Sequence, residues 1–176
     1  MVPAAGWRLR RAGAGDHQAL ALVAGATFLE AFAGVLDGAD IVAHVVANND
    51  AAAFARYLGT GAIATLAEVT PGDAPVGYTL LTVPDLPVPA EPGDIEIKRI
   101  YVLAPWHGEG LAAALMERAL SDAREAACRR LLLGVYAGNA RARRFYVKHG
   151  FEAIGERRFR VGSTWHDDLV FARRLD

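Results

Sequence analysis

The chain has 176 residues, of which 53% are hydrophobic and 22% are charged, and its formal net charge at pH 7 is -1. This length suits a single domain, residues 1–176, with one hydrophobic core. A charge so close to zero argues against nucleic acid as a partner, because binding a polyanion needs a basic surface.

The sequence also argues against a membrane or secreted protein. No apolar run reaches the roughly 18 residues that a membrane span needs, and the first residues lack the basic and apolar regions of a signal peptide. Cys128 is the only cysteine, which fits a reducing compartment. We therefore expect a cytoplasmic location without membrane contact, and we expect Cys128 to be a buried helix residue.

The N-terminal half is predicted to contain a strand, a long helix, two short helices and a hairpin. Aspartate residues mark the helix starts, because their side chains accept hydrogen bonds from the first N–H groups of a helix. The predicted elements are a strand at 7–10, a helix capped by Asp16 that ends near Ala31, helices at 41–47 and 51–58 capped by Asp40 and Asp50, and hairpin strands at 63–68 and 76–83. Pro71 and Gly72 set up the turn of the hairpin.

The C-terminal half alternates strands and helices. Residues 84–93 are rich in proline and form a loop, because proline cannot donate to a strand ladder. The elements that follow are a strand at 95–103, a helix at 111–127, a buried strand at 131–135, a helix at 140–148 that Gly150 ends, and strands at 151–156 and 169–175. This order predicts an α/β (α+β) fold with a mixed sheet and helices on both faces.

A glycine-rich turn, His107-Gly108-Glu109-Gly110-Leu111-Ala112, joins the strand at 95–103 to the next helix. Glycines let a ligand approach the main chain, and the first N–H groups of a helix favour an anion such as pyrophosphate. A Walker A loop is excluded because Gly-Lys-Ser/Thr is absent. A Rossmann fingerprint fits residues 108–113 by letters, but the acidic residue expected about 20 positions later is missing. An ordinary glycine loop is the remaining alternative.

Two blocks resemble the GNAT superfamily of N-acetyltransferases. The turn, preceded by Ile100-Tyr101-Val102, is similar to the family's Gln/Arg-x-x-Gly-x-Gly/Ala motif. Residues 139–151 are similar to its Asn-x-x-Ala-x-x-Phe-Tyr-x-x-x-Gly-Phe block. The resemblance spans residues 7–175 and is strong from residue 95 onward. It implies the GNAT fold, with a mixed sheet of six or seven strands, and acetyl-CoA as co-substrate.

The resemblance also implies where acetyl-CoA binds. The corresponding positions are Ile100, Tyr101, Val102, His107, Gly108, Glu109, Gly110, Leu111, Ala112 and Asn139. The backbone of 100–102 pairs with pantetheine like an added strand, and the turn holds the pyrophosphate. Asn139 contacts the pantetheine region, caps the following helix, or does both. His107 replaces the usual Gln or Arg and Glu109 a frequent basic residue, so we expect weaker phosphate binding.

In this family, as the resemblance implies, the acceptor amine attacks the thioester directly. Tyr146 matches the family's general acid, because a phenol is protonated at neutral pH and can pass its proton to sulfur. Glu96 lies eleven residues before His107, the offset of the general base in some relatives, and a period of two places it on the side of Ile100 and Val102. The structural alternatives are aromatic packing for Tyr146 and a solvated ion pair for Glu96.

A narrower resemblance, to bacterial PaiA-type polyamine acetyltransferases, covers residues 27–32 and 159–169. It favours a polyamine-like small-molecule amine as acceptor. The residues expected to line the acceptor site are Phe28, Glu30, Trp165, His166 and Asp167. A peptide or protein N-terminus, an amino acid, and a non-catalytic acyl-CoA-binding role remain alternatives.

Metal ions and a second copy of the chain are the remaining partners to consider. The scattered histidines lack metal-ligand spacing, so no metal is expected. Dimers are common among relatives, which leaves a homodimer open.

Overall fold

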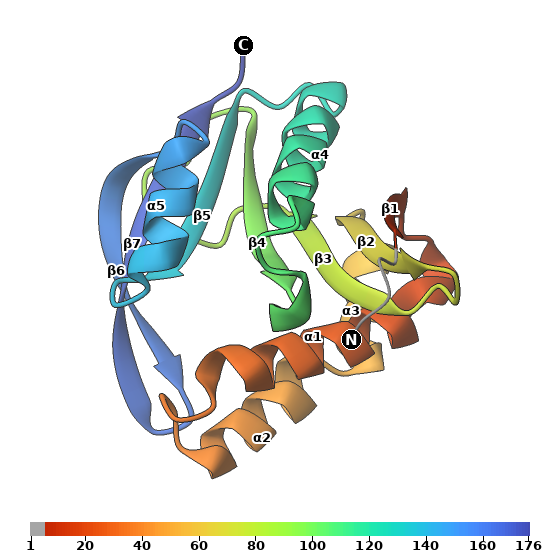
Figure 1. Cartoon of the computed structure of the whole chain (residues 1–176). Coiled ribbons are helices and arrows are strands. Elements are labelled where there is room, and N and C mark those ends of the chain that lie inside the picture. Colours follow the sequence, from red (N-terminus) through yellow and green to blue (C-terminus); the bar gives the residue numbers. More distant parts are fainter. Residues whose placement is uncertain (1–5) are drawn as a thin grey trace.

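A seven-stranded mixed sheet forms the centre of the structure (Figure 1), a computed structural model that describes residues 6–176. The strands are β1 (Gly6–Arg11), β2 (Ile63–Thr70), β3 (Pro75–Thr82), β4 (Asp94–Val102), β5 (Arg130–Tyr136), β6 (Glu152–Val161) and β7 (Thr164–Arg174). Their order across the sheet is β1-β2-β3-β4-β5-β7-β6. Only β4 and β5 pair in parallel among these strands. The predicted mixed sheet is confirmed.

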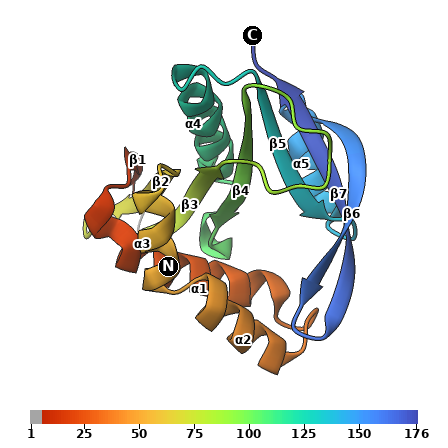
Figure 2. The same ribbon diagram turned by 180° about the vertical axis from the view of Figure 1, so that it is seen from behind.

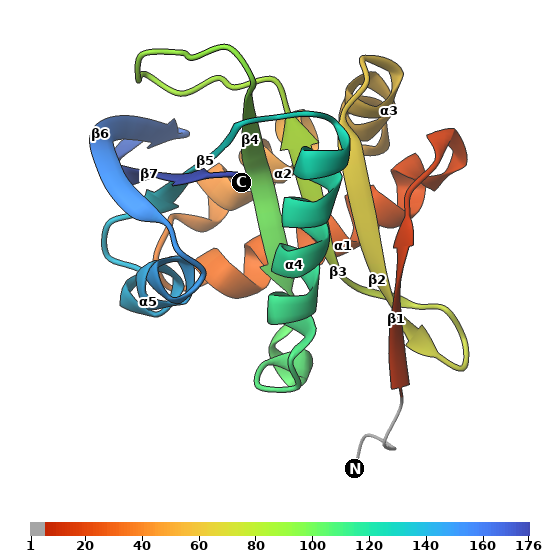
Figure 3. The same cartoon turned by 90° about the horizontal axis from the view of Figure 1, so that it is seen from above.

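Helices cover both faces of the sheet, as predicted; Figure 3 shows α4 and α5 on one side and α3 on the other. The helices are α1 (His17–Phe32), α2 (Gly38–Asn48), α3 (Ala51–Gly59), α4 (Leu111–Glu125) and α5 (Ala140–Lys148). Alternation along the strands explains the two cores. In β2, Leu66 packs with α1 and α3, whereas its neighbour Ala67 packs with α4. Within residues 6–176, no helix has the length and apolarity needed to cross a membrane.

Helix α3 follows its predicted cap, since the Asp50 carboxylate accepts a hydrogen bond from the Ala53 N–H at 2.7 Å. Helix α5 has its predicted bounds, and Gly150 follows with a φ of +78°. A left-handed φ of this kind is favourable for glycine and ends a helix.

Three local predictions were wrong. Helix α2 begins earlier than expected and is capped by Asp37, not Asp40, because the Asp37 carboxylate accepts from the Ala39 N–H at 2.8 Å. Asp16 precedes α1, but its carboxylate bonds the Gly13 N–H and Arg10 and makes no cap to α1. Cys128 is not a helix residue, because α4 ends at Glu125, and it is half-buried.

The last hairpin is longer than the sequence predicted. The predicted strands, at 151–156 and 169–175, are the outer ends of β6 and β7, which continue to a turn at Gly162. The arginines of β6 concealed the strand, because its exposed side lacks an apolar pattern. The tip of the hairpin reaches α2 (Figure 2). Val161 at this tip packs against Phe28 of α1 and Ile41 of α2. This contact closes one side of the cavity described below.

Candidate functional site

The two parallel strands, β4 and β5, pair over a short stretch. Residues 94–96 of β4 lie opposite 130–132 of β5, and the ladder ends there. Beyond that point β4 continues with β3 as its partner, and β5 continues with β7. From residue 97 to 102, the edge of β4 that faces β5 is therefore not paired with a neighbouring strand. An extended ligand can pair with such an edge as an added strand.

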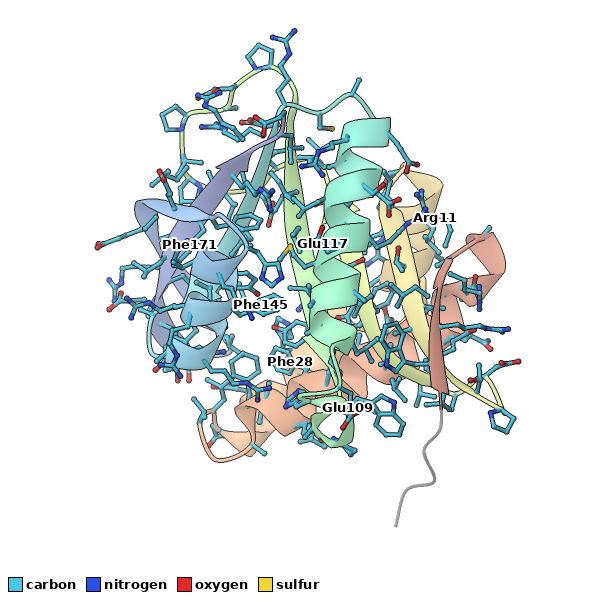
Figure 4. The ribbon with its side chains drawn as sticks, turned by 45° about the horizontal axis from the view of Figure 1, so that its top comes forward. Arg11, Phe28, Glu109, Glu117, Phe145 and Phe171 are labelled. Atoms are coloured by element: carbon cyan, nitrogen blue, oxygen red, sulfur yellow. The ribbon has the colours of Figure 1, made fainter. Side chains whose placement is uncertain are left out.

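The loop between β4 and α4 exposes main-chain groups at the same end of β4. Gly108 and Gly110 have φ values of +88° and +78°, and a Cβ at either position would meet nothing within 4 Å. Helix α4 starts at Leu111, and its N-cap, Gly110, offers no side-chain cap. Its first N–H groups are therefore available to an anion. Glu109 is exposed on this loop (Figure 4).

His107 is held by two contacts inside the protein. Its Nε2 lies 2.7 Å from the carbonyl oxygen of Val102, and its Nδ1 lies 2.9 Å from Nη1 of Arg141 on α5. A carbonyl only accepts and a guanidinium only donates, so Nε2 carries the proton and Nδ1 accepts. The imidazole N–H predicted to face a phosphate is thus directed at Val102. Instead the ring links the glycine loop to Arg141.

Glu96 lies on the opposite face of β4 from the one predicted. The pairing of β3 with β4 shifts register, because Leu80 faces Arg99 whereas Leu81 faces Ile97. This bulge inserts one residue into β4 and reverses the alternation beyond it. Glu96, Lys98, Arg99 and Tyr101 consequently line one cavity, whereas Ile97 and Ile100 pack toward α4. The predicted common side of Glu96 with Ile100 and Val102 was wrong for this reason.

That cavity has a volume of about 370 Å³, within the range of small-molecule sites. It lies on the side of β4 away from α4 and is enclosed by α1, α2, α3, β3, β4, β5 and the β6–β7 hairpin. Aromatic side chains from six elements contribute to its wall: Phe28, Phe32, Tyr57, Tyr78, Tyr101, Tyr136 and Phe159. Its ionisable side chains, apart from tyrosines, are His44, Asp85, Glu96, Lys98, Arg99, Arg157, His166 and Asp168.

Glu96 is a buried carboxylate of β4. It is only 3% exposed, and its Oε2 accepts a hydrogen bond from the Asp85 N–H at 2.7 Å. Within residues 6–176 it has no cationic side-chain partner at ion-pair distance, so the predicted solvated pair with Lys98 is absent. The backbone donor from the proline-rich loop fixes one oxygen and leaves the other for a ligand or water.

The basic residues of the cavity differ in their partners. Arg157 donates from Nε and Nη2 to Oδ2 of Asp168 at 3.1 and 3.0 Å, and burial raises the pKa of that carboxyl against the effect of Arg157. Lys98 lies 3.9 Å from the exposed carboxylate of Asp85. Arg99 bonds the carbonyl of Asn48 through Nη2 at 2.9 Å and forms no ion pair within residues 6–176.

One end of the cavity is aromatic and nearly neutral. The ring of His44 stacks on Phe28, with centroids 4.3 Å apart and planes at 10°, and Phe159 approaches its edge. Burial, and secondarily the charge of Arg99, lowers the pKa of His44 below its ordinary value. The imidazole is therefore uncharged at neutral pH.

Tyr146 lies on α5, where it packs in the same core cluster as α4, and it does not line the cavity. Its ring is 8% exposed and packs against Phe145, Phe151 and Phe171. Burial, and secondarily the neighbouring Tyr101, raises the pKa of the Tyr146 phenol. The group therefore stays protonated throughout the neutral range, as an acid must. The aromatic packing proposed as its alternative is also present.

The predicted acceptor residues fall into two groups. Phe28 and His166 line the cavity, whereas Glu30 and Trp165 do not. The Glu30 carboxylate accepts a hydrogen bond from the Ala104 N–H at 2.8 Å, so it ties α1 to the loop after β4. Trp165 is 53% exposed and lies beside two arginines of β6. The fifth predicted residue, Asp167, is exposed.

Asn139 caps α5, since its Oδ1 accepts from the Ala142 N–H at 3.0 Å. The charged wall of the cavity, above all Lys98 and Arg99, was not predicted from the sequence. Two successive charges inside an apolar strand break the period of two, and that signal could have revealed the bulge. Within residues 6–176, no group of three His, Cys, Asp or Glu side chains could hold a metal ion.

Comparison with known proteins agrees with this arrangement. Residues 47–151 match the model of the acetyltransferase (GNAT) family. An uncharacterized N-acetyltransferase of Mycobacterium tuberculosis is 38% identical over 160 residues, covering 91% of this chain and 98% of the relative. One from Lactobacillus delbrueckii subsp. lactis is 32% identical over 100 residues, covering 56% of this chain and 58% of the relative.

Solved structures share the fold. The PaiA N-acetyltransferase of Thermoplasma acidophilum, crystallised with coenzyme A, has a TM-score of 0.77 and 16% identity, covering 96% of this chain and 99% of that one. The ribosomal-protein-S18-alanine N-acetyltransferase of Escherichia coli has a TM-score of 0.70 and 17% identity, covering 97% and 94%. The family match and the 38% identical relative show that the chain belongs to the GNAT family of N-acetyltransferases, which use acetyl-CoA.

Proposed function

We propose that the protein transfers the acetyl group of acetyl-CoA to the primary amine of a small molecule, which attacks the thioester directly. The observation that carries this proposal is the 370 Å³ cavity, with buried Glu96 in its wall, beside the free edge of β4. A cavity of this size suits a small molecule. The neighbouring glycine loop suits the phosphates of the donor.

The chain's groups fit acetyl-CoA in two places. The edge of β4 at residues 100–102 offers main-chain partners for pantetheine, and Asn139 lies at the start of the neighbouring α5. The loop from His107 to Ala112 offers the N–H groups of the uncapped α4 for the pyrophosphate, with open space beside both glycines. Arg141, held against His107, adds a positive charge next to this loop.

The transfer needs one proton acceptor and one proton donor. The amine nitrogen forms a bond to the thioester carbonyl carbon, and the carbon–sulfur bond breaks as the thiolate leaves. Glu96 takes the proton from the attacking amine, directly or through water, and Tyr146 gives its phenolic proton to the sulfur. The products are the N-acetyl amine and free coenzyme A, and no covalent enzyme intermediate is required.

The choice of acceptor amine rests on separate observations. The PaiA-type resemblance of the sequence favours a polyamine-like amine, and the PaiA protein of Thermoplasma acidophilum shares the fold. Identity of 16% carries no information on the acceptor. A peptide N-terminus or an amino acid also fits a cavity of this volume.

The test is a thiol-release assay with acetyl-CoA over polyamines, amino acids, aminoglycosides and short peptides. We expect Glu96→Gln to lower kcat/KM by about 100-fold with the best acceptor and to change the pH–rate profile, because a general base typically contributes that much. Glutamine can still accept from the Asp85 N–H, so the loop stays in place. Glu117→Gln, on the exposed face of α4 (Figure 4), is the matched control and should match wild type.

Two results would contradict the proposal. Coenzyme A binding by calorimetry without turnover of any amine would favour a non-catalytic acyl-CoA-binding role. Unchanged kcat/KM and an unchanged pH profile in Glu96→Gln would remove Glu96 as the base.

A further inference from the structure

The charges inside the cavity form one neutralised pair, one weak pair between Lys98 and Asp85, and two unpaired groups. Arg157 and Asp168 neutralise each other through two short hydrogen bonds. Arg99 has no carboxylate partner within residues 6–176, and Glu96 has no cationic one. Both unpaired groups belong to β4 and line the same cavity because of the bulge. The cavity therefore presents a free negative group and a free positive group to one ligand.

Arg99 is held as a rigid anchor. Its guanidinium lies 5.3 Å from the ring centroid of Phe54 and 5.6 Å from that of Tyr57, and Nη2 donates to the Asn48 carbonyl. The planar guanidinium has further N–H donors beyond this bond. Burial raises the pKa of the neighbouring Tyr78, and the charge of Arg99 counteracts this rise.

Orphaned polar atoms gather at the same place. Within residues 6–176, Arg99 Nη1, Asn49 Oδ1 and His166 Nε2 are buried without a hydrogen-bond partner, and all three residues line the cavity. Buried polar groups are normally paired. Three residues that line this cavity thus carry an unpaired polar atom, so its wall is polar as well as aromatic.

We propose that the acceptor is a zwitterionic amine of amino-acid type, whose carboxylate binds Arg99 while its amine faces Glu96. This inference rests on the proposed acetyl transfer and names the substrate class of the same site. Arginine binds carboxylates strongly because its planar donors match the two oxygens. The aromatic end of the cavity, at Phe28, His44 and Phe159, accommodates an apolar side chain of the acceptor.

A linear polyamine is a poorer match. It would bring its further cations into a cavity that already holds Arg99 and the weakly paired Lys98. Like charges repel strongly where water is excluded. Glu96 is the one buried carboxylate of this wall without a cationic partner in the described residues. The charges thus favour the amino-acid alternative over the polyamine-like acceptor.

The experiment compares leucine and phenylalanine with leucinamide and phenylalaninamide, and with spermidine and cadaverine, in the thiol-release assay. Each amide keeps the amine and the side chain but lacks the carboxylate. Its amine also has the lower pKa and is therefore more available to attack. A preference for the acid consequently reports binding of the carboxylate. We expect wild-type kcat/KM for the acids to exceed that for the amides by at least about 10-fold.

Substitution of Arg99 tests the anchor. Arg99→Gln should raise KM for the acids and abolish their advantage over the amides, with acetyl-CoA affinity unchanged. Arg99→Lys should restore part of the preference, because it keeps the charge but not the planar donors. Arg158→Gln removes an arginine of β6 whose side chain is 71% exposed, and it should behave as wild type. Melting temperatures check that the Arg99 variants fold.

The outcomes separate the two proposals. Equal or better turnover of the amides or the polyamines by wild type would overturn the zwitterionic acceptor and leave acetyl transfer standing. An acid preference that survives unchanged in a folded Arg99→Gln would overturn the role of Arg99. Absence of turnover with every amine, despite coenzyme A binding, would overturn both.

Discussion

Replacing Tyr146 by phenylalanine isolates the proposed acid, because it removes the hydroxyl and keeps the ring. The ring centroids of Phe145, Phe151 and Phe171 lie 5.5, 6.0 and 6.3 Å away, and these contacts do not depend on the hydroxyl. No hydrogen bond contributes to the pKa of this phenol within the described chain. The free energy of unfolding should therefore change by less than about 0.5 kcal/mol, and Tm by less than about 2 °C.

The catalytic effect should be much larger than the effect on stability. Loss of a general acid typically lowers the rate by about 100-fold, which corresponds to about 2.7 kcal/mol of activation free energy. Burial and the neighbouring Tyr101 raise the pKa of the phenol above its ordinary value. In wild type, Tyr146 therefore keeps its proton up to at least the ordinary tyrosine pKa of about 10. Loss of this proton should not lower the rate below that pH.

The assay is single-turnover acetyl transfer with enzyme in excess, so that product release cannot mask the chemical step. The dissociation constant of acetyl-CoA, measured by calorimetry, should stay within about twofold of wild type. A folded Tyr146→Phe with an unchanged single-turnover rate would refute the acid role and leave the aromatic packing as the only function of this side chain.

Two further predictions concern the donor loop and acid stability. Gly110→Ala should lower the free energy of unfolding by about 1 to 2 kcal/mol, because φ is +78° there although no atom obstructs a Cβ. The same substitution should weaken acetyl-CoA binding in calorimetry. Gly15→Ala is the control, since it has equal space and an ordinary φ, and it should change neither quantity. The Arg10 hydrogen bonds lower the pKa of Asp16 from 3.8 to about 2, so this carboxylate stabilises the fold above pH 3.8 and the gain is lost as pH falls toward 2. Asp16→Asn should therefore cost about 1 to 2 kcal/mol in urea unfolding at pH 7, and a difference from wild type that does not shrink toward pH 2 would contradict this.

The elements that the sequence predicted best are those specified by local chemistry. Helix α5 starts at the side-chain cap of Asn139 and ends before the left-handed Gly150, and both signals lie within the helix's own neighbourhood. The glycine loop is similarly local. Its motif determines a backbone conformation whichever residues surround it.

Predictions that depend on distant partners were less successful. Asp37 and Asp40 are both good caps, and the fold uses Asp37. Glu30 was expected in the acceptor site, but a backbone N–H 74 positions along the chain engages its carboxylate instead. Such pairings follow from packing of α1 against the loop after β4. No local pattern encodes them.

The bulge in β4 connects the fold to the proposed specificity. In a regular strand, residues 96 and 99 would face opposite sides of the sheet. The inserted residue brings Glu96 and Arg99 into one cavity, while Ile97 and Ile100 stay buried against α4. A slip of the strand by one residue would expose those isoleucines to the cavity, so the apolar contacts hold the register. The unpaired carboxylate of Glu96 and the unpaired guanidinium of Arg99 thus depend on hydrophobic packing on the other face of the sheet.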